Sequence, residues 1–193
     1  MLPAALDRRP IIVVLAGPNG AGKSTFYEAF LRETGLRFVN ADEIRAATTA
    51  DAYAAAAVAG QIRRELAAQR ESFVFETVLS DPVGEKVSWL EGMAAAGYTV
   101  VMCFIGIPGP DTSIERVAMR VSQGGHDVPD EKLVARYART TANLGRAIRT
   151  LPFVLAFDNG NLAEPYRRVA EYEGGRRVFV ADRVPAWLPR HKP

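Results

Sequence analysis

The chain has 193 residues, 48% of them hydrophobic and 24% charged, the composition of a single globular domain, residues 1–193. A formal net charge of +2 argues against nucleic acid as a partner. No stretch approaches the ~18 uninterrupted apolar residues of a membrane span, and too few apolar residues precede Asp7 for a signal-peptide core, so we expect a cytoplasmic protein that does not enter a membrane.

The first predicted strand leads into a phosphate-binding loop. Ile11 to Ala16 is a continuous apolar run typical of a buried strand, and Thr25 to Glu33 has the pattern of a helix. Between them, two glycines five residues apart are followed by Lys and Ser, the pattern of a nucleotide-binding loop. The predicted nucleotide-binding residues are Gly17, Pro18, Asn19, Gly20, Ala21, Gly22, Lys23, Ser24 and Thr25.

Each residue type in this loop has a physical role in binding a nucleoside triphosphate. Glycines let the backbone curl so that its N–H groups point at an anion. Lys23 adds a positive charge for the β- and γ-phosphates, and the Ser24 hydroxyl is a ligand for Mg²⁺. The sequence therefore predicts ATP and Mg²⁺ as cofactors.

Strands and helices alternate along the rest of the chain. Strands separated by helices predict right-handed crossovers and a mainly parallel sheet with helices on both faces, an α/β fold of the P-loop NTPase type. An antiparallel hairpin is expected at the C-terminal end, within residues 165–182. Cys103 lies in an apolar run and is expected in the core. The predicted strands are Leu36–Asn40, Phe73–Thr77, Tyr98–Ile107, Phe153–Phe157, Arg167–Tyr172 and Arg176–Ala181, and the predicted helices are Asp51–Arg70, Pro82–Ala96, Thr112–Val121 and Pro129–Leu151.

Acidic residues follow the predicted strands, where ligands of such a sheet bind. Asp42 follows the second strand and is placed to accept a proton from an attacking hydroxyl, with a turn or helix-capping acid as the alternative. Arg45, one turn later, either pairs with Asp42 or binds substrate. Glu76 and Thr77 close the third strand, where Glu76 contacts the Mg²⁺ hydration shell, holds a substrate hydroxyl or forms a structural ion pair. Asp158-Asn159 is either a turn after the last parallel strand or a contact to the base.

Arginines on two later helices supply positive charge for the transferring phosphate. Arg116 and Arg120 share one helix face, and Arg136 and Arg139 lie on the next helix. A Gly-containing loop joins these helices, which predicts a lid over the nucleotide, residues 110–150. His126 in that loop either contacts substrate or packs within the lid.

The ordered set of these motifs resembles the zeta-toxin family of P-loop kinases. The resemblance covers roughly residues 11 to 160. It rests on the phosphate loop, on Phe38-Val39-Asn40-Ala41-Asp42-Glu43-Ile44, on Glu76-Thr77 with Leu79-Ser80, and on Gly124-Gly125-His126-Asp127-Val128-Pro129 with Arg136-Tyr137. Well-known members phosphorylate the 3′-hydroxyl of UDP-N-acetylglucosamine with ATP and Mg²⁺, and an antitoxin protein holds them inactive.

The resemblance implies a role for individual residues. Lys23 would hold phosphates, Asp42 would be the catalytic base, and Glu76 would bind substrate, with Thr77, Arg45 and His126 nearby. Lid arginines, of which Arg120 and Arg136 are the candidates, would stabilise the transferring phosphate, and Arg116 would contact the nucleotide. Chloramphenicol-type phosphotransferases share the layout of a catalytic Asp after the second strand.

Two departures from the toxins leave the acceptor open. The chain is shorter than the toxins that act on the nucleotide sugar, and it ends in the predicted hairpin followed by Pro185-Ala186-Trp187. The leading interpretation is an ATP-dependent kinase of a small-molecule hydroxyl. The alternatives are a regulatory ATP-binding module of a toxin–antitoxin pair and a kinase of polynucleotide ends, against which the near-neutral charge argues.

Overall fold

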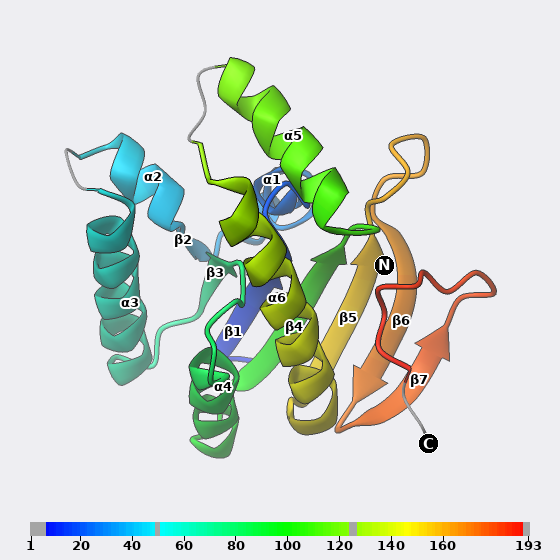
Figure 1. Ribbon diagram of the computed structural model, residues 1–193. Helices are drawn as coiled ribbons and strands as arrows, with labels where there is room; N and C mark the ends of the chain where they lie inside the picture. The colour runs from blue at the N-terminus through cyan, green and yellow to red at the C-terminus, as the bar shows by residue number, and fades with distance from the viewer. Residues whose placement is uncertain (1–6, 49–50, 124–126, 191–193) are drawn as a thin grey trace.

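A seven-stranded sheet forms the centre of the computed structural model, which describes residues 7–48, 51–123 and 127–190 (Figure 1). Its strand order is β2-β3-β1-β4-β5-β6-β7. The first five strands in that order pair in parallel, and β6 and β7 add an antiparallel hairpin at one edge. The strands are β1 (Ile11–Ala16), β2 (Arg37–Val39), β3 (Phe73–Thr77), β4 (Thr99–Gly106), β5 (Phe153–Asp158), β6 (Arg167–Glu173) and β7 (Arg176–Val180).

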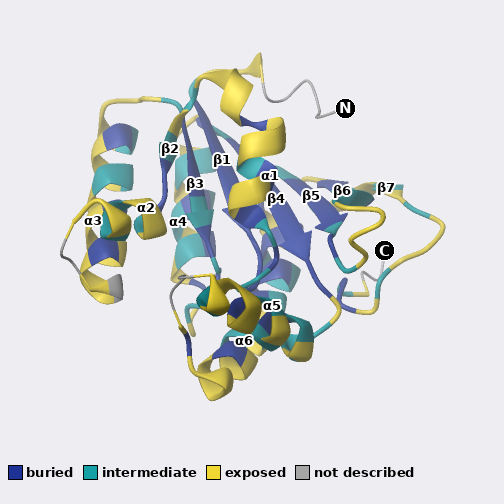
Figure 2. Ribbon diagram, turned by 90° about the horizontal axis from the view of Figure 1, so that it is seen from above, coloured by how far each residue is buried: buried dark blue, intermediate teal, exposed yellow. Residues whose placement is uncertain are grey.

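Helices cover both faces of the sheet, which confirms the predicted fold class (Figure 2). The helices are α1 (Lys23–Phe30), α2 (Ala41–Ala46), α3 (Ala52–Ala68), α4 (Glu85–Ala95), α5 (Pro110–Ser122) and α6 (Asp130–Thr150), with a short 3₁₀ turn, η2 (Arg32–Thr34). Two hydrophobic clusters pack against opposite faces of the sheet. One joins the strands to α3, α4 and α6, and the other joins them to α1.

Side chains of the central strands alternate between these two clusters. Ile12 and Val14 of β1 belong to the cluster beneath α3, α4 and α6, whereas Val13 and Leu15 belong to the cluster beneath α1. Since both faces are covered, the whole of β1 is buried, which explains its continuous apolar sequence. Cys103 of β4 is also fully buried, as expected.

Three local predictions were inaccurate. The helix predicted from Pro82 begins at Glu85, because Gly84 adopts a left-handed conformation and the Asp81 carboxylate accepts a hydrogen bond from the N–H of Glu85. Val83, which has the helical spacing of the apolar residues Val87 and Leu90, precedes the helix and is 76% exposed. The short helix α2 was not predicted.

Candidate active site

The phosphate-binding loop takes a backbone path that requires glycine. At Gly17, φ is +146°, and a Cβ atom there would lie 2.2 Å from the carbonyl oxygen of Ile105. Gly20 and Gly22 have φ values of +72° and +87°, in the left-handed region that residues with a Cβ rarely adopt. The loop therefore curls closely against β4 before α1 begins at Lys23.

Side chains from later segments of the chain brace the loop. Each donates a hydrogen bond to a loop carbonyl, which leaves the loop N–H groups available to an anion. Burial raises the pKa of the Tyr166 hydroxyl, so this group stays a donor. The three bonds run from Ser113 Oγ to Asn19 O at 2.7 Å, from Asn159 Nδ2 to Ala21 O at 2.9 Å, and from Tyr166 Oη to Gly22 O at 3.0 Å.

Glu76 lies at the centre of the polar residues beside the loop. Its carboxylate is 3.6 Å from Lys23 Nζ and accepts a hydrogen bond of 2.8 Å from Ser24 Oγ. Asn40 Nδ2 donates to the same carboxylate at 3.4 Å. The side chains of Lys23 and Glu76 are only 5% and 14% exposed, so little solvent screens their attraction. Lys23 also donates to Pro18 O at 3.0 Å.

Asp42 lies in the first turn of α2, opposite these residues. Asn40 caps the helix by accepting a hydrogen bond of 2.9 Å from the N–H of Asp42. The same Asn40 side chain contacts Glu76, so one amide connects the position of Asp42 to that of Glu76. Asp42 is exposed, and no side chain of the described chain pairs with its carboxylate. The carboxylate is therefore accessible to a substrate.

All these groups open into a cleft of about 720 Å³, a volume typical of ligand sites. Of the predicted site residues, the cleft brings together Asn19, Gly20, Gly22, Lys23, Ser24, Thr25, Asp42, Glu76, Thr77, Arg116, Arg120 and Arg136. Gly17, Pro18 and Ala21 shape the loop without lining the cleft.

Arg45 does not line this cleft, and its Nε is buried without a hydrogen-bond partner in the described chain. His126 lies outside the described residues, so its predicted role stays a prediction. Arg139, considered with Arg136 as a lid residue, donates a hydrogen bond of 2.8 Å to Ser80 O. Arg116 donates to Gly20 O at 3.4 Å and to Asn159 O at 2.9 Å.

Helix α6 fixes the loop that follows β3. Leu79 in this loop is fully buried and has a φ of +60°, which is strained for a residue with a large side chain. The strain persists because α6 holds three consecutive carbonyls of the loop. The bonds run from Thr140 Oγ1 to Val78 O at 2.7 Å, from Asn143 Nδ2 to Leu79 O at 2.8 Å, and from Arg139 Nε to Ser80 O.

Several cleft residues were missed by sequence reasoning. Asn40 could have been found as a helix cap, because it precedes two acids in a short helical segment. On α3, the spacing of Tyr53, Ala56, Ala59 and Arg63 places them on one helix face, but only the fold shows that this face meets the cleft. Lys86 and Lys132 also line the cleft and carry no local signal.

The oxygen atoms beside the loop fit a magnesium ion bound together with a nucleotide. Ser24 Oγ and the Glu76 carboxylate lie 2.8 Å apart, and Mg²⁺ prefers such oxygen ligands, with water and phosphate completing its shell. Among the described residues, no group of three or more His, Cys, Asp or Glu side chains could hold a metal by itself. The residues thus fit an ion that arrives with phosphate.

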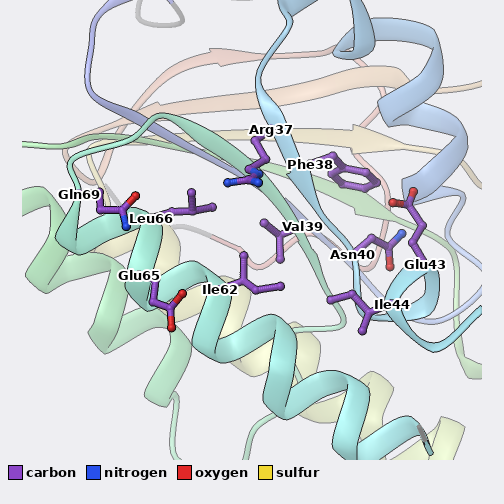
Figure 3. A pocket seen from close by; sticks show the side chains of 10 residues that line it. All are labelled: Arg37, Phe38, Val39, Asn40, Glu43, Ile44, Ile62, Glu65, Leu66 and Gln69. Atoms are coloured by element: carbon purple, nitrogen blue, oxygen red, sulfur yellow. The ribbon is translucent and has the colours of Figure 1, made fainter. Parts of the chain in front are cut away.

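A second, smaller hollow of about 280 Å³ lies behind α2 (Figure 3). Val39, Ile44, Ile62 and Leu66 give it an apolar floor between β2 and α3. Asn40 lines both this hollow and the cleft. Glu43, the neighbour of Asp42, faces the hollow, and burial together with Glu28 and Glu76 raises the pKa of its carboxyl. Neighbouring acids of α2 therefore line different pockets.

A family model described as Zeta toxin matches residues 3–170. No curated protein matches the sequence. Within the part of the chain that the structure describes, no helix has the length and apolar character to cross a membrane.

The fold is similar to those of several solved structures. A complex of AvrRxo1-ORF1 and -ORF2 with ATP has a TM-score of 0.68 and 19% identity over 92% of this chain and 63% of that chain. The same complex with sulphate ions has a TM-score of 0.69, also at 19% identity over 92% and 63%. A structure of the PezAT chromosomal toxin–antitoxin system of Streptococcus pneumoniae has a TM-score of 0.59 and 15% identity over 93% and 76%. This chain thus spans less than two thirds of the AvrRxo1 chain, and at these identities the likeness shows the fold.

Proposed function

Because the chain belongs to the zeta-toxin family, we propose that it is an ATP- and Mg²⁺-dependent phosphotransferase. It moves the γ-phosphate of ATP to a hydroxyl group of a small molecule. The observation that carries the proposal is the cluster of Lys23, Ser24 and Asn40 around Glu76, with Asp42 open to the same cleft. A cation for phosphate, oxygen ligands for Mg²⁺ and a free carboxylate for a hydroxyl proton are the parts that phosphoryl transfer needs.

In this reaction the chain's own groups position the substrates and move one proton. The loop N–H groups and Lys23 bind the phosphates of ATP. Ser24 and Glu76 would hold Mg²⁺, which would offset phosphate charge when bound. Asp42 accepts the proton of the acceptor hydroxyl as the hydroxyl oxygen attacks the γ-phosphorus, and the bond from that phosphorus to the β–γ bridging oxygen breaks to release ADP. Arg120 and Arg136, which line the cleft from α5 and α6, offset the charge on the transferring phosphoryl oxygens.

The acceptor and the protein partner are finer parts of the proposal. UDP-N-acetylglucosamine is the first acceptor to test, since well-known members of the family act on it. An antitoxin is the first partner to test, because the PezAT structure is of a toxin–antitoxin system and the AvrRxo1 structures are of a two-protein complex. The structure with ATP supports ATP as the donor.

The experiment is phosphate transfer from ATP to a panel of hydroxyl metabolites that includes UDP-N-acetylglucosamine, with products identified by mass. We expect Asp42→Asn to lower the rate about 10²- to 10⁴-fold, the range for loss of a general base. Glu43→Gln is the matched control, because this neighbour in α2 faces the other hollow, and it should retain the rate. Full activity of Asp42→Asn would remove the assigned base. ATP binding by the native protein without transfer to any acceptor would favour a regulatory ATP-binding module.

A further inference from the structure

Helix α3 lines the cleft with a stripe of four residues, in which two alanines separate an aromatic ring from a guanidinium. The stripe consists of Tyr53, Ala56, Ala59 and Arg63, and Tyr53 is 75% exposed. Asp51 fixes the start of the helix by accepting hydrogen bonds from the N–H groups of Tyr53 and Ala54. Residues 53 and 63 are separated by about 15 Å along the helix axis, so the stripe is as long as a ligand of nucleotide size.

Arg63 is half-buried and carries a charge that no described acid offsets. Its guanidinium lies 4.8 Å from the centroid of the Phe75 ring. Within residues 7–48, 51–123 and 127–190, Arg63 forms no ion pair. Burial, and next the charge of Arg64, lower its pKa. A guanidinium in such a place needs an anion, and a ring face supplies only part of that stabilisation.

Glu76 and Asp81 are engaged with other groups, and neither Asp42 nor Asp127, the other acids of the cleft, forms an ion pair with Arg63 in the described part of the chain. Glu76 contacts Lys23 and Ser24. Asp81 lies 3.9 Å from Lys86 Nζ and accepts a hydrogen bond from the N–H of Glu85. The cleft therefore retains a positive charge on its α3 side.

Strand geometry separates Arg63 from the phosphate-binding loop. Phe75, beneath Arg63, belongs to the cluster under α3, α4 and α6. Its neighbour Glu76 contacts Ser24 of α1, on the opposite face of the sheet, because successive side chains of a strand point to opposite faces. Arg63 therefore lies on the α3 side of β3, opposite to the side on which Glu76 contacts α1.

We propose that Arg63 is a specificity-determining residue that binds an oxyanion of the acceptor, a phosphate or a carboxylate, so that the enzyme selects acidic hydroxyl compounds over their neutral counterparts. This inference rests on the proposed phosphotransfer. The guanidinium fork bonds two oxygens of such a group at once. The ring of Phe75 keeps the fork aligned from behind.

The test uses acceptors that share their hydroxyls and differ in charge. N-acetylglucosamine, its 1-phosphate and UDP-N-acetylglucosamine form one such set, and glycerol with glycerol 3-phosphate and glycerate forms another. Each is titrated calorimetrically into protein that is saturated with Mg²⁺ and a non-hydrolysable ATP analogue, which fills the donor side. Binding is thereby measured without turnover.

We expect at least one acidic compound to bind the native protein more tightly than its neutral counterpart. Arg63→Ala should weaken that binding about 10- to 100-fold, as loss of a charged hydrogen bond does, and leave affinity for the ATP analogue unchanged. Arg63→Lys should recover part of the loss. Arg64→Ala is the matched control, because it removes the same charge one position along α3 from a residue that does not line the cleft.

Three results would overturn the inference: no acidic compound binds, neutral and acidic members bind equally, or Arg63→Ala and Arg64→Ala have equal effects. A separate transfer assay distinguishes this failure from failure of the proposed function. Transfer to a neutral member alone would keep the phosphotransferase and remove the role of Arg63. Arg63-dependent binding of an acidic member without any transfer would keep the subsite and remove the phosphotransferase.

Discussion

Replacement of Trp187 by alanine tests whether the segment after β7 belongs to the core. The Trp187 ring is 6% exposed and packs against Phe104, with ring centroids 5.6 Å apart. It also lies over Gly106, where a Cβ atom would approach ring carbons to 2.3 Å. Its Nε1 donates a hydrogen bond of 3.0 Å to the Asp158 carboxylate. The side chain therefore fills a site that no other described group occupies.

The expected loss follows from the buried ring. A buried aromatic side chain removes about 150–250 Å² from water, worth about 4–6 kcal/mol at 25 cal/mol per Å². Since the surroundings relax in part, measured Trp→Ala losses are about 3–5 kcal/mol. At about 2–4 °C per kcal/mol for a domain of this size, Tm should fall by about 6–20 °C. Trp187→Phe keeps most of the packing and should cost about 1–3 kcal/mol, mainly through the lost hydrogen bond to Asp158.

The assay is urea and thermal unfolding followed by circular dichroism, which does not depend on the tryptophan itself. Val184→Ala, three residues earlier and 50% exposed, is the control and should change stability by less than about 0.5 kcal/mol. A loss below about 1 kcal/mol for Trp187→Ala would show that the segment contributes little to folding. The reasoning from its burial would then be refuted.

Two further predictions concern the loop and the core. Gly22→Ala should abolish measurable binding of ATP in a calorimetric titration. At this position φ is +87°, and the new Cβ would lie 2.8 Å from both Asn159 Nδ2 and Tyr166 Oη. Retained affinity would mean that the loop adapts to a side chain. Burial raises the pKa of the Cys103 thiol to about 12, so Ellman's reagent should label native protein only as fast as it unfolds. The unfolded thiol ionises near pH 9 while the folded one stays neutral, so stability should fall as pH rises from about 9 toward 12, and less steeply in Cys103→Ala. Equal slopes, or rapid labelling of the native state, would contradict that burial.

Local patterns predicted the parts of the fold whose physics is local. The strand Ile11–Ala16 is apolar throughout because it is buried on both faces, and the loop after it carries its own glycine and lysine pattern. The hairpin of β6 and β7 was predicted from Gly174-Gly175, which adopt the positive φ values of a tight turn. In each case the signal can be read from consecutive residues.

Features that depend on distant contacts escaped prediction. A three-residue strand and a six-residue helix, β2 and α2, are too short to show a periodicity. The insertion of β3 between β2 and β1 likewise depends on contacts between strands that are distant in sequence. Asn159 was considered as a turn residue or a contact to the base, but it braces the loop by donating to Ala21 O across 138 residues of sequence. No local pattern reports such a contact.

The end of β3 explains how a single strand can serve two substrates in the proposed reaction. Glu76 faces α1 and the loop that would hold ATP, whereas Phe75 supports Arg63 on the side where the acceptor would lie. The chain immediately after this strand is held by α6, through Thr140 on Val78 O and Asn143 on Leu79 O. Transfer requires the two substrates to be fixed relative to each other within a fraction of an ångström. A strand end that α6 holds rigid and whose side chains alternate between the two subsites meets that requirement, because any displacement of β3 moves Glu76 and Phe75 together.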